Sequence, residues 1–341
     1  MISIAAFPEK GEPYTECFYD SLRTKGIIIN DGDFSGRWIL KNWKTFNYFH
    51  FHWPSFFYAD RNSTRNAIKN IIRFSMLLFL IRLSGSKILW TAHNLYPHDK
   101  SRPFFIDKAA RRIIICLSYK IFVHGNSAAQ ILKREFKSAE TKIVIIDHGN
   151  WVDCYENKAS RNKSRKKIGV ASDSYIYLFI GFVKEYKNIL FLIETFKKIT
   201  DGTLLLIAGK YQDKNYYERV ITAARYRKNN IVIDERYIPD NELQYYLNAC
   251  NVVVLPYTEI LTSGAAMLAI SFGRPVIAPR QGYLKELINP ECGILYNPRE
   301  LNGLLNALNE VQKKQFDEKR IIKHAMRFNW DNIAEIVVKS I

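Results

Sequence analysis

The sequence predicts an α/β protein built from two doubly wound, Rossmann-like domains. Short apolar segments typical of buried parallel strands alternate along the chain with longer segments of helical periodicity. The chain has 341 residues, which exceeds what one compact core holds and fits two domains of about 150 residues each. A polar, basic segment at 156–167, ENKASRNKSRKK, is typical of an exposed connection between domains. We therefore expect one domain over 1–155 and a second over 156–327.

Composition excludes several classes of protein. Hydrophobic residues make up 48% of the chain, which favours a folded protein over a disordered one. The five cysteines are scattered without a CxxC pair, so neither a disulfide framework nor a zinc site is predicted, and a reducing cytoplasm fits this usage. Met1 leads directly into an expected strand at 2–7, so we expect no signal peptide.

The net charge of +17 lies mainly in the first half of the chain. Residues 1–155 hold 22 Lys/Arg against 13 Asp/Glu, a net charge of +9, and an anionic partner is implied. Basic residues recur every fourth position at the start of a largely apolar helix: Arg61, Arg65, Lys69 and Arg73. This stripe is interpreted either as a solvated helix face or as a contact with anionic lipid. Charged residues interrupt the apolar run, so we expect a cytoplasmic protein, peripheral on the inner face of the cell membrane rather than spanning it.

The segment 251–298 carries the most specific chemistry. Val252 to Leu255 form an apolar run, closed by Pro256, that predicts a buried parallel strand. Thr262, Ser263 and Gly264 then lead into a helical run at 265–272. The first backbone N–H groups of a helix have no partner within it, and its dipole favours an anion there. This loop therefore predicts a site for a phosphate or diphosphate.

Four motifs in this segment resemble the donor-sugar signature of GT-B glycosyltransferases: LPYTEILTSGA, SFGRPVIAP, G-x-L-x-E and GILYNP. The resemblance is to the retaining family four and its bacterial exopolysaccharide and capsule relatives. The chain departs from the family pattern of two glutamates eight residues apart, because Glu259 is followed at that spacing by Met267. The resemblance implies a GT-B fold, with the two domains facing a central cleft and a C-terminal helix at 328–341 packing back on the first.

The implied activity is transfer of a sugar from a UDP- or GDP-linked donor to a glycan or polyprenyl-linked acceptor in bacterial surface polysaccharide synthesis. The second domain would bind the nucleotide sugar and the first the acceptor, with no cofactor and no metal required. Lys187, Lys184 and the loop N–H groups would stabilise the charge of the departing diphosphate. We therefore give Lys187 a catalytic role as well.

The donor-binding residues implied by the resemblance follow expected strands of the second domain: Gly181, Lys184, Lys187, Asn188, Gly209, Lys210, Tyr237, Ile238, Tyr257, Thr262, Ser263, Gly264, Ala265 and Glu286. Two of these have an open alternative, since Tyr237 and Ile238 fit hydrophobic core as well as a nucleobase contact. In the loop FIGFVKEYKN, Lys187 is the lysine that matches the family motif residue for residue.

Two histidines of the first domain follow expected strands, where open α/β sheets bind ligands. His52 closes the segment NYFHFHWP, and His93 follows the strand at 87–90. Both are candidates for the base that an inverting transferase needs and a retaining one does not, and packed structural histidines are the alternative. The acceptor-binding candidates are Gly11, Trp53 and Asn94.

Three further features are interpreted structurally. The DxD triplet of Asp31 and Asp33 predicts a turn rather than a metal site. Gly11 equally fits an ordinary turn. Asn126 or Ser127 is expected to cap the helix that follows the strand at 120–123.

Two other classes of function were weighed. A GT-B nucleotide-sugar epimerase would need paired acidic groups, of which the sequence offers only Glu286 and Glu259. A non-catalytic basic binding protein is the other alternative, but the aromatic residues do not form a nucleic-acid-binding motif, so no nucleic acid is expected as a partner. The sugar, the acceptor and the anomeric outcome stay open.

Overall fold

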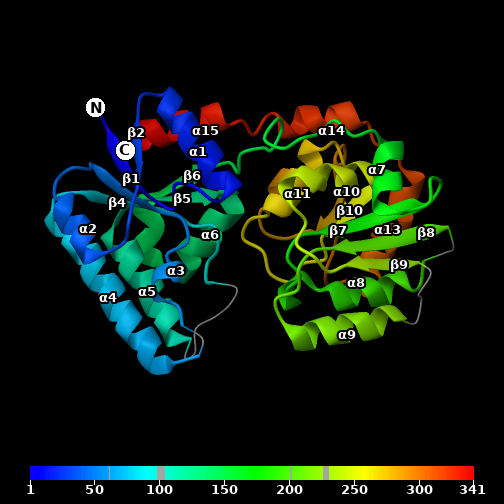
Figure 1. The fold of residues 1–341 in the computed structure, drawn as a ribbon, viewed down its shortest axis with the longest axis horizontal. Coiled ribbons are helices and arrows are strands. Elements are labelled where there is room, and N and C mark those ends of the chain that lie inside the picture. Colours follow the sequence, from blue (N-terminus) through cyan, green and yellow to red (C-terminus); the bar gives the residue numbers. More distant parts are fainter. Residues whose placement is uncertain (61, 98–103, 200–201, 226–229) are drawn as a thin grey trace. The chain divides into compact units, whose positions relative to one another are not determined.

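The computed structural model describes residues 1–341 apart from 61, 98–103, 200–201 and 226–229 (Figure 1). It divides the chain into two compact units, Met1–Gly149 with Asn329–Ile341 and Asn150–Phe328. Each unit holds a six-stranded, wholly parallel sheet with helices on it. The α/β class with doubly wound sheets is therefore confirmed.

The sheet of unit 1 has the order β2-β1-β3-β4-β5-β6. Its strands are β1 Ser3–Phe7, β2 Ile28–Asp31, β3 Tyr48–Phe51, β4 Lys87–Thr91, β5 Ser118–His124 and β6 Ile143–Ile146. Its helices are α1 Pro13–Thr24, α2 Gly36–Lys41, α3 Ser55–Tyr58, α4 Thr64–Leu83, α5 Phe105–Leu117, α6 Gly125–Glu135, the 3₁₀ helix η1 Lys137–Lys142 and α15 Trp330–Ser340. The first strand has neighbours on both sides that follow it in the chain, so the strand order reverses beside β1.

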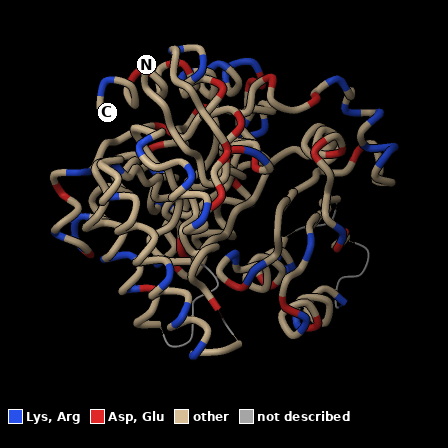
Figure 2. The backbone as a smooth tube through the Cα atoms, turned by 60° about the vertical axis from the view of Figure 1, so that its left-hand side comes forward, with Lys and Arg blue, Asp and Glu red and all other residues tan. Residues whose placement is uncertain are grey.

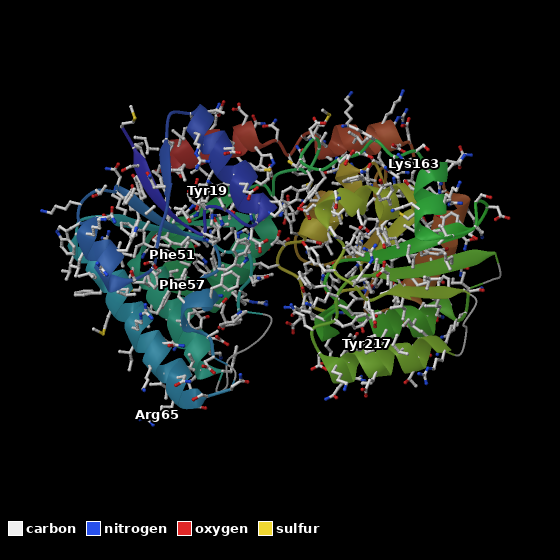
Figure 3. The ribbon with its side chains drawn as sticks, in the orientation of Figure 1. Tyr19, Phe51, Phe57, Arg65, Lys163 and Tyr217 are labelled. Carbon is white, nitrogen blue, oxygen red and sulfur yellow. The ribbon has the colours of Figure 1, made fainter. Side chains whose placement is uncertain are left out.

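Aromatic side chains fill the core of unit 1 between the sheet and its helices. Phe7 stacks on Phe51 with ring centroids 4.9 Å apart, and Phe57 meets Phe51 edge-on at 6.1 Å (Figure 3). All four residues of β3 are buried. Both faces of the sheet are covered, which makes a buried strand apolar on both sides.

The C-terminal helix α15 belongs to unit 1, although 179 residues of unit 2 come before it in the chain. It packs on α1, and Lys25 at the end of α1 lies 2.7 Å from Asp331. The ring of Trp330 meets that of Tyr14 edge-on at 5.2 Å. The first and last helices of the chain therefore hold each other against the same sheet.

The expected cap of α6 is wrong. The helix begins at Gly125, so Asn126 and Ser127 lie inside its first turn, and the N-cap position is held by His124 without a side-chain cap. A positive φ of 81° at Gly125 turns the backbone directly from β5 into the helix. No residue is then left between the strand and the helix to serve as the cap.

The sheet of unit 2 has the order β12-β11-β10-β7-β8-β9. Its strands are β7 Tyr175–Ile180, β8 Thr203–Ala208, β9 Ile231–Asp234, β10 Val252–Val254, β11 Val276–Pro279 and β12 Gly293–Tyr296. Its helices are α7 Arg161–Ile168, α8 Ile189–Phe196, α9 Lys214–Arg225, α10 Leu243–Ala249, α11 Gly264–Ser271, α12 Leu284–Leu287, α13 Gly303–Lys313 and α14 Glu318–Ala325, with 3₁₀ helices η2 Glu185–Lys187 and η3 Asp240–Glu242. The strand order reverses beside β7.

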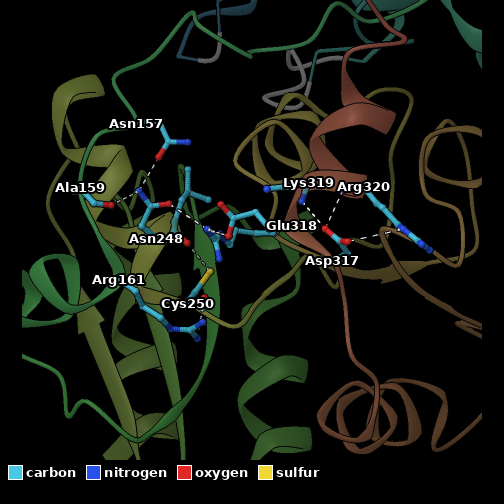
Figure 4. A network of polar contacts seen from close by, with 11 residues as sticks. Asn157, Ala159, Arg161, Asn248, Cys250, Asp317, Glu318, Lys319 and Arg320 are labelled. Atoms are coloured by element: carbon cyan, nitrogen blue, oxygen red, sulfur yellow. Dashed lines mark hydrogen bonds and ion pairs between the residues drawn. The ribbon is translucent and has the colours of Figure 1, made fainter.

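A polar network ties the ends of unit 2 to its sheet (Figure 4). Arg274, just after α11, lies 2.7 Å from Glu318 on α14 and 3.4 Å from the side-chain oxygen of Asn248 on α10. The Asn248 amide in turn donates to Asn157 at 2.7 Å and to the carbonyl of Ala159 at 2.9 Å. Entering and leaving segments are thus both fastened beside α11.

Two glycines at the end of β7 and β8 bring their backbones into direct contact. A Cβ added at Gly209 would lie 2.1 Å from the carbonyl oxygen of Gly181, well inside any contact a side chain can make. Gly209 also has a φ of 147°, which side chains rarely allow. The loop after β8 can therefore lie this close to Gly181 only because position 209 lacks a side chain.

We predict that Gly209→Ala lowers the stability of unit 2 by more than the roughly 1–2 kcal/mol that positive φ alone costs a residue with a Cβ. Gly169→Ala is the matched control, because Gly169 has a φ of 72° and its added Cβ would meet open space. Urea unfolding of both variants measures the difference. Equal losses of stability would mean that the Gly181 contact does not constrain the loop.

Candidate functional site

The loops after β7 and β10 meet where the strand order of unit 2 reverses. Thr258, after β10, donates from its backbone N–H and its hydroxyl to the carbonyl of Tyr186, after β7, at 2.9 and 3.1 Å. In open parallel sheets this position is where ligands bind, because the loops on either side run to opposite faces and leave a crevice. Most donor residues expected from the sequence lie on these loops, at the start of α11 and on the loop after β8, while Tyr237 and Ile238 follow β9 and Glu286 follows β11.

Lys187 lies among aromatic rings at this edge of the sheet. Its ammonium lies 5.6 Å from the ring centroid of Tyr257 and 5.5 Å from that of Phe179, beside Gly181. No ion pair holds Lys187 among the described residues. Burial, with a smaller effect from Lys184, lowers the pKa of Lys187 to about 7. An anion bound beside it would restore the charged form, so this lysine is suited to hold a diphosphate.

The phosphate loop begins α11 at Gly264, one residue earlier than the run at 265–272 indicated. Ser263 is its N-cap, and its hydroxyl accepts a hydrogen bond from the N–H of Ala266 at 3.1 Å. The Trp151 indole donates to the carbonyl of Gly264 at 3.3 Å and steadies the first turn. Thr262 adds a buried hydroxyl that has no hydrogen-bond partner in the described part of the chain. The first turn can thus offer both N–H groups and a hydroxyl to an anion.

The remaining donor candidates are placed unevenly around this edge. Lys210 is exposed after β8, and Asn188, with a φ of 59°, forms the turn between η2 and α8. Tyr237 is 54% exposed after β9, with its ring 5.9 Å from that of Phe182, whereas Ile238 is buried. Of the two nucleobase candidates, only the tyrosine offers a surface to a ligand.

The two positions of the glutamate pattern lie in different environments. Met267 is fully buried on α11, while Glu259 is exposed on the loop after β10 and Glu286 is exposed on α12. A side chain at 267 faces the core of unit 2 and cannot reach a ligand there. The departure from the family pattern is therefore built into the packing of α11.

Five histidines line the carboxyl edge of unit 1 in the order of its strands. They lie at or just after the ends of β3, β4, β5 and β6: His50, His52, His93, His124 and His148. Their ring centroids are 4.4, 5.3, 5.3 and 5.2 Å apart from each to the next. The two predicted histidines, His52 and His93, are thus the middle of a longer row, which we call the histidine row.

Hydrogen bonds join part of the histidine row to α1. The nitrogen Nδ1 of His52 lies 3.0 Å from Nε2 of His93. Tyr19, labelled in Figure 3, places its hydroxyl 2.9 Å from Nε2 of His52 and 3.0 Å from Nδ1 of His50. Tyr14 lies edge-on to four rings of the row. Sequence reasoning missed these two tyrosines.

The signal for the other histidines was present but unused. His124 ends the strand segment FVH and His148 follows IVIID, so each stands at a strand end like His93. His50 and His52 alternate along one strand and share its face. Nothing in the helical pattern of α1 marks Tyr19, because a buried aromatic on a helix is most often core.

The histidine row is buried and uncharged. Burial lowers the pKa of His52, His93 and His124 well below the ordinary value, that of His50 to about 3 and that of His148 to about 4. Within the described residues no group of three or more His, Cys, Asp or Glu side chains is arranged to hold a metal ion.

The acceptor candidates surround the open end of the histidine row. Trp53 stacks on His93 with centroids 4.7 Å apart, and Asn94, half-buried, is the next residue. Gly11 has a φ of 90° and its backbone N–H donates to Glu16 at 3.1 Å, so it makes a turn. Asp31 ends β2 and accepts from the N–H of Glu9 at 3.2 Å.

Comparison with known proteins finds similarity to sugar transferases. Residues 174–314 match the family model described as "Glycosyl transferases group 1". The GDP-mannose:glycolipid 4-beta-D-mannosyltransferase of Xanthomonas campestris pv. campestris is 25% identical over 300 residues, which cover 87% of this chain and 78% of the relative. The lipopolysaccharide 1,2-N-acetylglucosaminetransferase of Salmonella typhimurium is 22% identical over a match that covers 81% of this chain and 73% of that relative. The crystal structure of Anabaena Alr3699/HepE in complex with UDP-glucose matches with a TM-score of 0.73 at 14% identity, over 100% of this chain and 99% of that one.

We predict that acid destabilises unit 1 through the histidine row. An unfolded histidine takes up a proton near pH 6.5, whereas His148 in the fold does so only near pH 4. Between these values the unfolded chain binds more protons, so the free energy of unfolding falls as pH drops, by at most about 1.4 kcal/mol per pH unit for each such group. Urea unfolding from pH 7.5 to 4.5 measures this slope, which His148→Gln should make shallower. A stability independent of pH over that range would contradict burial of the row in neutral form.

Proposed function

We propose that this chain is a GT-B glycosyltransferase and that it moves a sugar from a UDP- or GDP-linked donor to a glycan or lipid-linked glycan. The match of residues 174–314 to the glycosyl transferases group 1 model supports the transferase class. The setting we propose is the synthesis of bacterial surface polysaccharide. One observation carries the donor assignment. The desolvated Lys187 lies where the strand order of unit 2 reverses, and the first turn of α11 lies at the same edge of the sheet. The printed names of relatives that act on glycolipid or lipopolysaccharide, and of a structure with UDP-glucose, support the two substrate classes.

The donor chemistry follows from the charge that develops on the leaving group. As the bond between the sugar and the diphosphate breaks, negative charge collects on the diphosphate oxygen. Lys187, Lys184 and the N–H groups of Gly264 and Ala265 would stabilise that charge, and charge-assisted hydrogen bonds in a dry site are stronger than neutral ones. We propose that these protein groups suffice and that no metal ion is required.

The acceptor chemistry is proposed for unit 1. His93 keeps 7% of its surface exposed, more than any other member of the histidine row, and its Nδ1 makes no hydrogen bond within the described residues. It is therefore the member that can take a proton from an acceptor hydroxyl. Trp53, stacked beside it, offers a flat apolar face for a sugar ring.

A second surface of unit 1 suits a lipid-linked acceptor. Exposed apolar residues form one stripe along α4, at spacings of three and four residues: Ile68, Ile72, Met76, Phe79 and Leu83. Arg65, Lys69 and Arg73 lie exposed beside the stripe, while Arg61 lies outside the described residues. Figure 2 marks the lysine and arginine positions of the described backbone in blue. An apolar stripe flanked by basic side chains is typical of a helix that lies in a membrane interface. No described helix is long and apolar enough to cross a bilayer.

We propose that α4 docks the protein peripherally on the anionic inner face of the cell membrane. Each apolar side chain of the stripe that enters the interface would contribute by leaving water, and each basic one by about 1 kcal/mol near an anionic surface. This docking would bring a polyprenyl-linked acceptor to the protein that uses it.

The experiment that tests the proposed activity is transfer of labelled sugar from a panel of UDP- and GDP-sugars to a polyprenyl-diphosphate glycan, with and without EDTA. Label in the glycolipid, unchanged by EDTA, is the expected result. Isomerised free nucleotide sugar would point to an epimerase, and complete loss of transfer with EDTA would overturn metal independence. A panel that yields neither product would overturn the transferase assignment for these substrates.

We predict that Lys187→Met lowers kcat by roughly 100-fold, because removing one donor to a developing oxyanion has that order of effect. The variant keeps the length of the side chain and removes its charge. Lys198→Met is the matched control, since Lys198 is an exposed lysine of the same unit away from the strand ends. Steady-state kinetics measure the effect, and wild-type turnover in Lys187→Met would remove this lysine from the site.

The same variant has a binding readout that needs no acceptor. Lys187 is mostly neutral above pH 7, and a bound diphosphate raises its pKa, so binding of UDP or GDP at pH 8 should take up a proton. Calorimetry in buffers of different ionisation enthalpy measures this uptake. It should disappear in Lys187→Met and persist in Lys198→Met.

We predict that the double variant Ile72→Glu/Met76→Glu sediments at least 10-fold less with vesicles of equal phosphatidylglycerol and phosphatidylcholine. Moving two apolar side chains from water into the membrane interface contributes more than the 1.4 kcal/mol that a 10-fold change in binding represents. Leu301→Glu, which changes an exposed leucine of unit 2, is the control and should bind like the wild type. Equal sedimentation of all three proteins would exclude the stripe as the docking surface.

A further inference from the structure

A continuous hydrogen-bonded chain runs inward from His93. It passes from Nε2 of His93 to Nδ1 of His52, and from Nε2 of His52 to the hydroxyl of Tyr19. From Tyr19 it continues to Nδ1 of His50, whose Nε2 lies 2.9 Å from the hydroxyl of Thr91. The exposed fraction falls from 7% at His93 to 1% at His52 and His50 and 0% at Tyr19, so the chain opens to solvent only at its His93 end.

The single proton of the Tyr19 hydroxyl couples the tautomers of all three histidines. If Tyr19 donates to His50, its oxygen accepts from Nε2–H of His52, so Nδ1 of His52 must accept from Nε2–H of His93. His93 then has a bare Nδ1. If Tyr19 donates to His52 instead, every bond in the chain reverses and Nδ1 of His93 carries a proton. Only these two arrangements satisfy every bond with neutral rings and also give the Tyr19 proton an acceptor in the hydrogen-bonded chain.

We propose that Tyr19 is a positioning residue that joins His93, His52 and His50 into one proton-accepting chain for the acceptor hydroxyl. The inference rests on the proposed function, in which His93 meets the acceptor. The acceptor O–H bond breaks and its proton goes to Nδ1 of His93, while the oxygen pair forms the new bond to the sugar and the sugar–diphosphate bond breaks. The Nε2 proton of His93 shifts toward His52, that of His52 toward Tyr19, and the hydroxyl proton toward His50, so the hydrogen-bonded chain shares the positive charge until product leaves.

The chain answers a difficulty that one buried histidine would face. Burial disfavours an imidazolium at any single ring of the histidine row. Passing the proton along short hydrogen bonds lets several polarised groups share the charge. Glu9 and Asp31 lie near Tyr19 and favour positive charge at the inner end, although Arg23, which pairs with Glu9, opposes them.

Histidine NMR tests the chain without any substrate. Tyr19→Phe keeps the ring but removes the hydroxyl, and Tyr19 has no direct hydrogen bond to His93. In protein labelled with ¹⁵N in its histidines, the variant should change the tautomer of His93 as well as those of His50 and His52. Tyr58→Phe is the matched control, because Tyr58 is an equally buried tyrosine of unit 1 that is not bonded to the row. An unchanged His93 tautomer in Tyr19→Phe would overturn the proposal.

Kinetics test the catalytic consequence. Tyr19→Phe should lower kcat roughly 10-fold with little change in KM, a part of the 10²–10⁴-fold that general-base catalysis supplies. Rates in mixtures of H₂O and D₂O should curve for the wild type, where several protons move, and become closer to linear in the variant. Tyr58→Phe should keep the wild-type rate and curvature. The same curvature in Tyr19→Phe would overturn the relay.

The two tests separate this inference from the function on which it rests. If no nucleotide sugar is a substrate but the His93 tautomer still responds to Tyr19→Phe, the proposed function fails and the coupled chain stands. If transfer occurs but the tautomers are independent, the function stands and the chain fails. A product whose anomeric configuration is retained would also overturn the relay, because retention does not call for this base.

Discussion

Each unit depends on one constraint, which is that the strands of a parallel sheet all end at the same edge. The loops that leave those ends are forced together, although the residues on them are far apart in the chain. In unit 2 this edge gathers Gly181, Lys187, Gly209 and the first turn of α11. In unit 1 it gathers histidines from four successive strands. The chemistry proposed for the protein lies on these two edges.

At the edge of unit 2, closely packed backbone lies beside Lys187, which has no carboxylate partner among the described residues. Gly181 and Gly209 touch through their backbones, which leaves no side chain to fill the space in front of Lys187. The lysine accordingly loses water without gaining a carboxylate partner, and its pKa falls to about 7. If stability were the only requirement, this lysine would be paired with a carboxylate or exposed to water. The arrangement makes sense if a ligand supplies the missing negative charge.

The edge of unit 1 uses the opposite electrostatics. Its buried histidines hydrogen-bond to one another, to Tyr19, to Thr91 and to backbone carbonyls, and burial keeps them neutral. Hydrogen bonds hold these rings in place, although Nε2 of His124 is buried without a partner among the described residues. The row therefore gives an uncharged set of proton donors and acceptors, of which His93 is the most exposed.

The sequence by itself determined the class of the fold and several strand positions, and it predicted a phosphate site at residues 262–264. The strands expected at 2–7, 87–90, 120–123 and 252–255 match β1, β4, β5 and β10 to within two residues, because apolar runs are local signals. Lys187 was also identified from its loop. The cap at Asn126 or Ser127 failed because Gly125 enters the helix directly, a backbone turn that side-chain preference does not reveal. Only the tertiary structure decided that Ile238 is core, that Met267 faces inward and that Tyr19 links three histidines, since strand order and helix packing bring these groups to their neighbours.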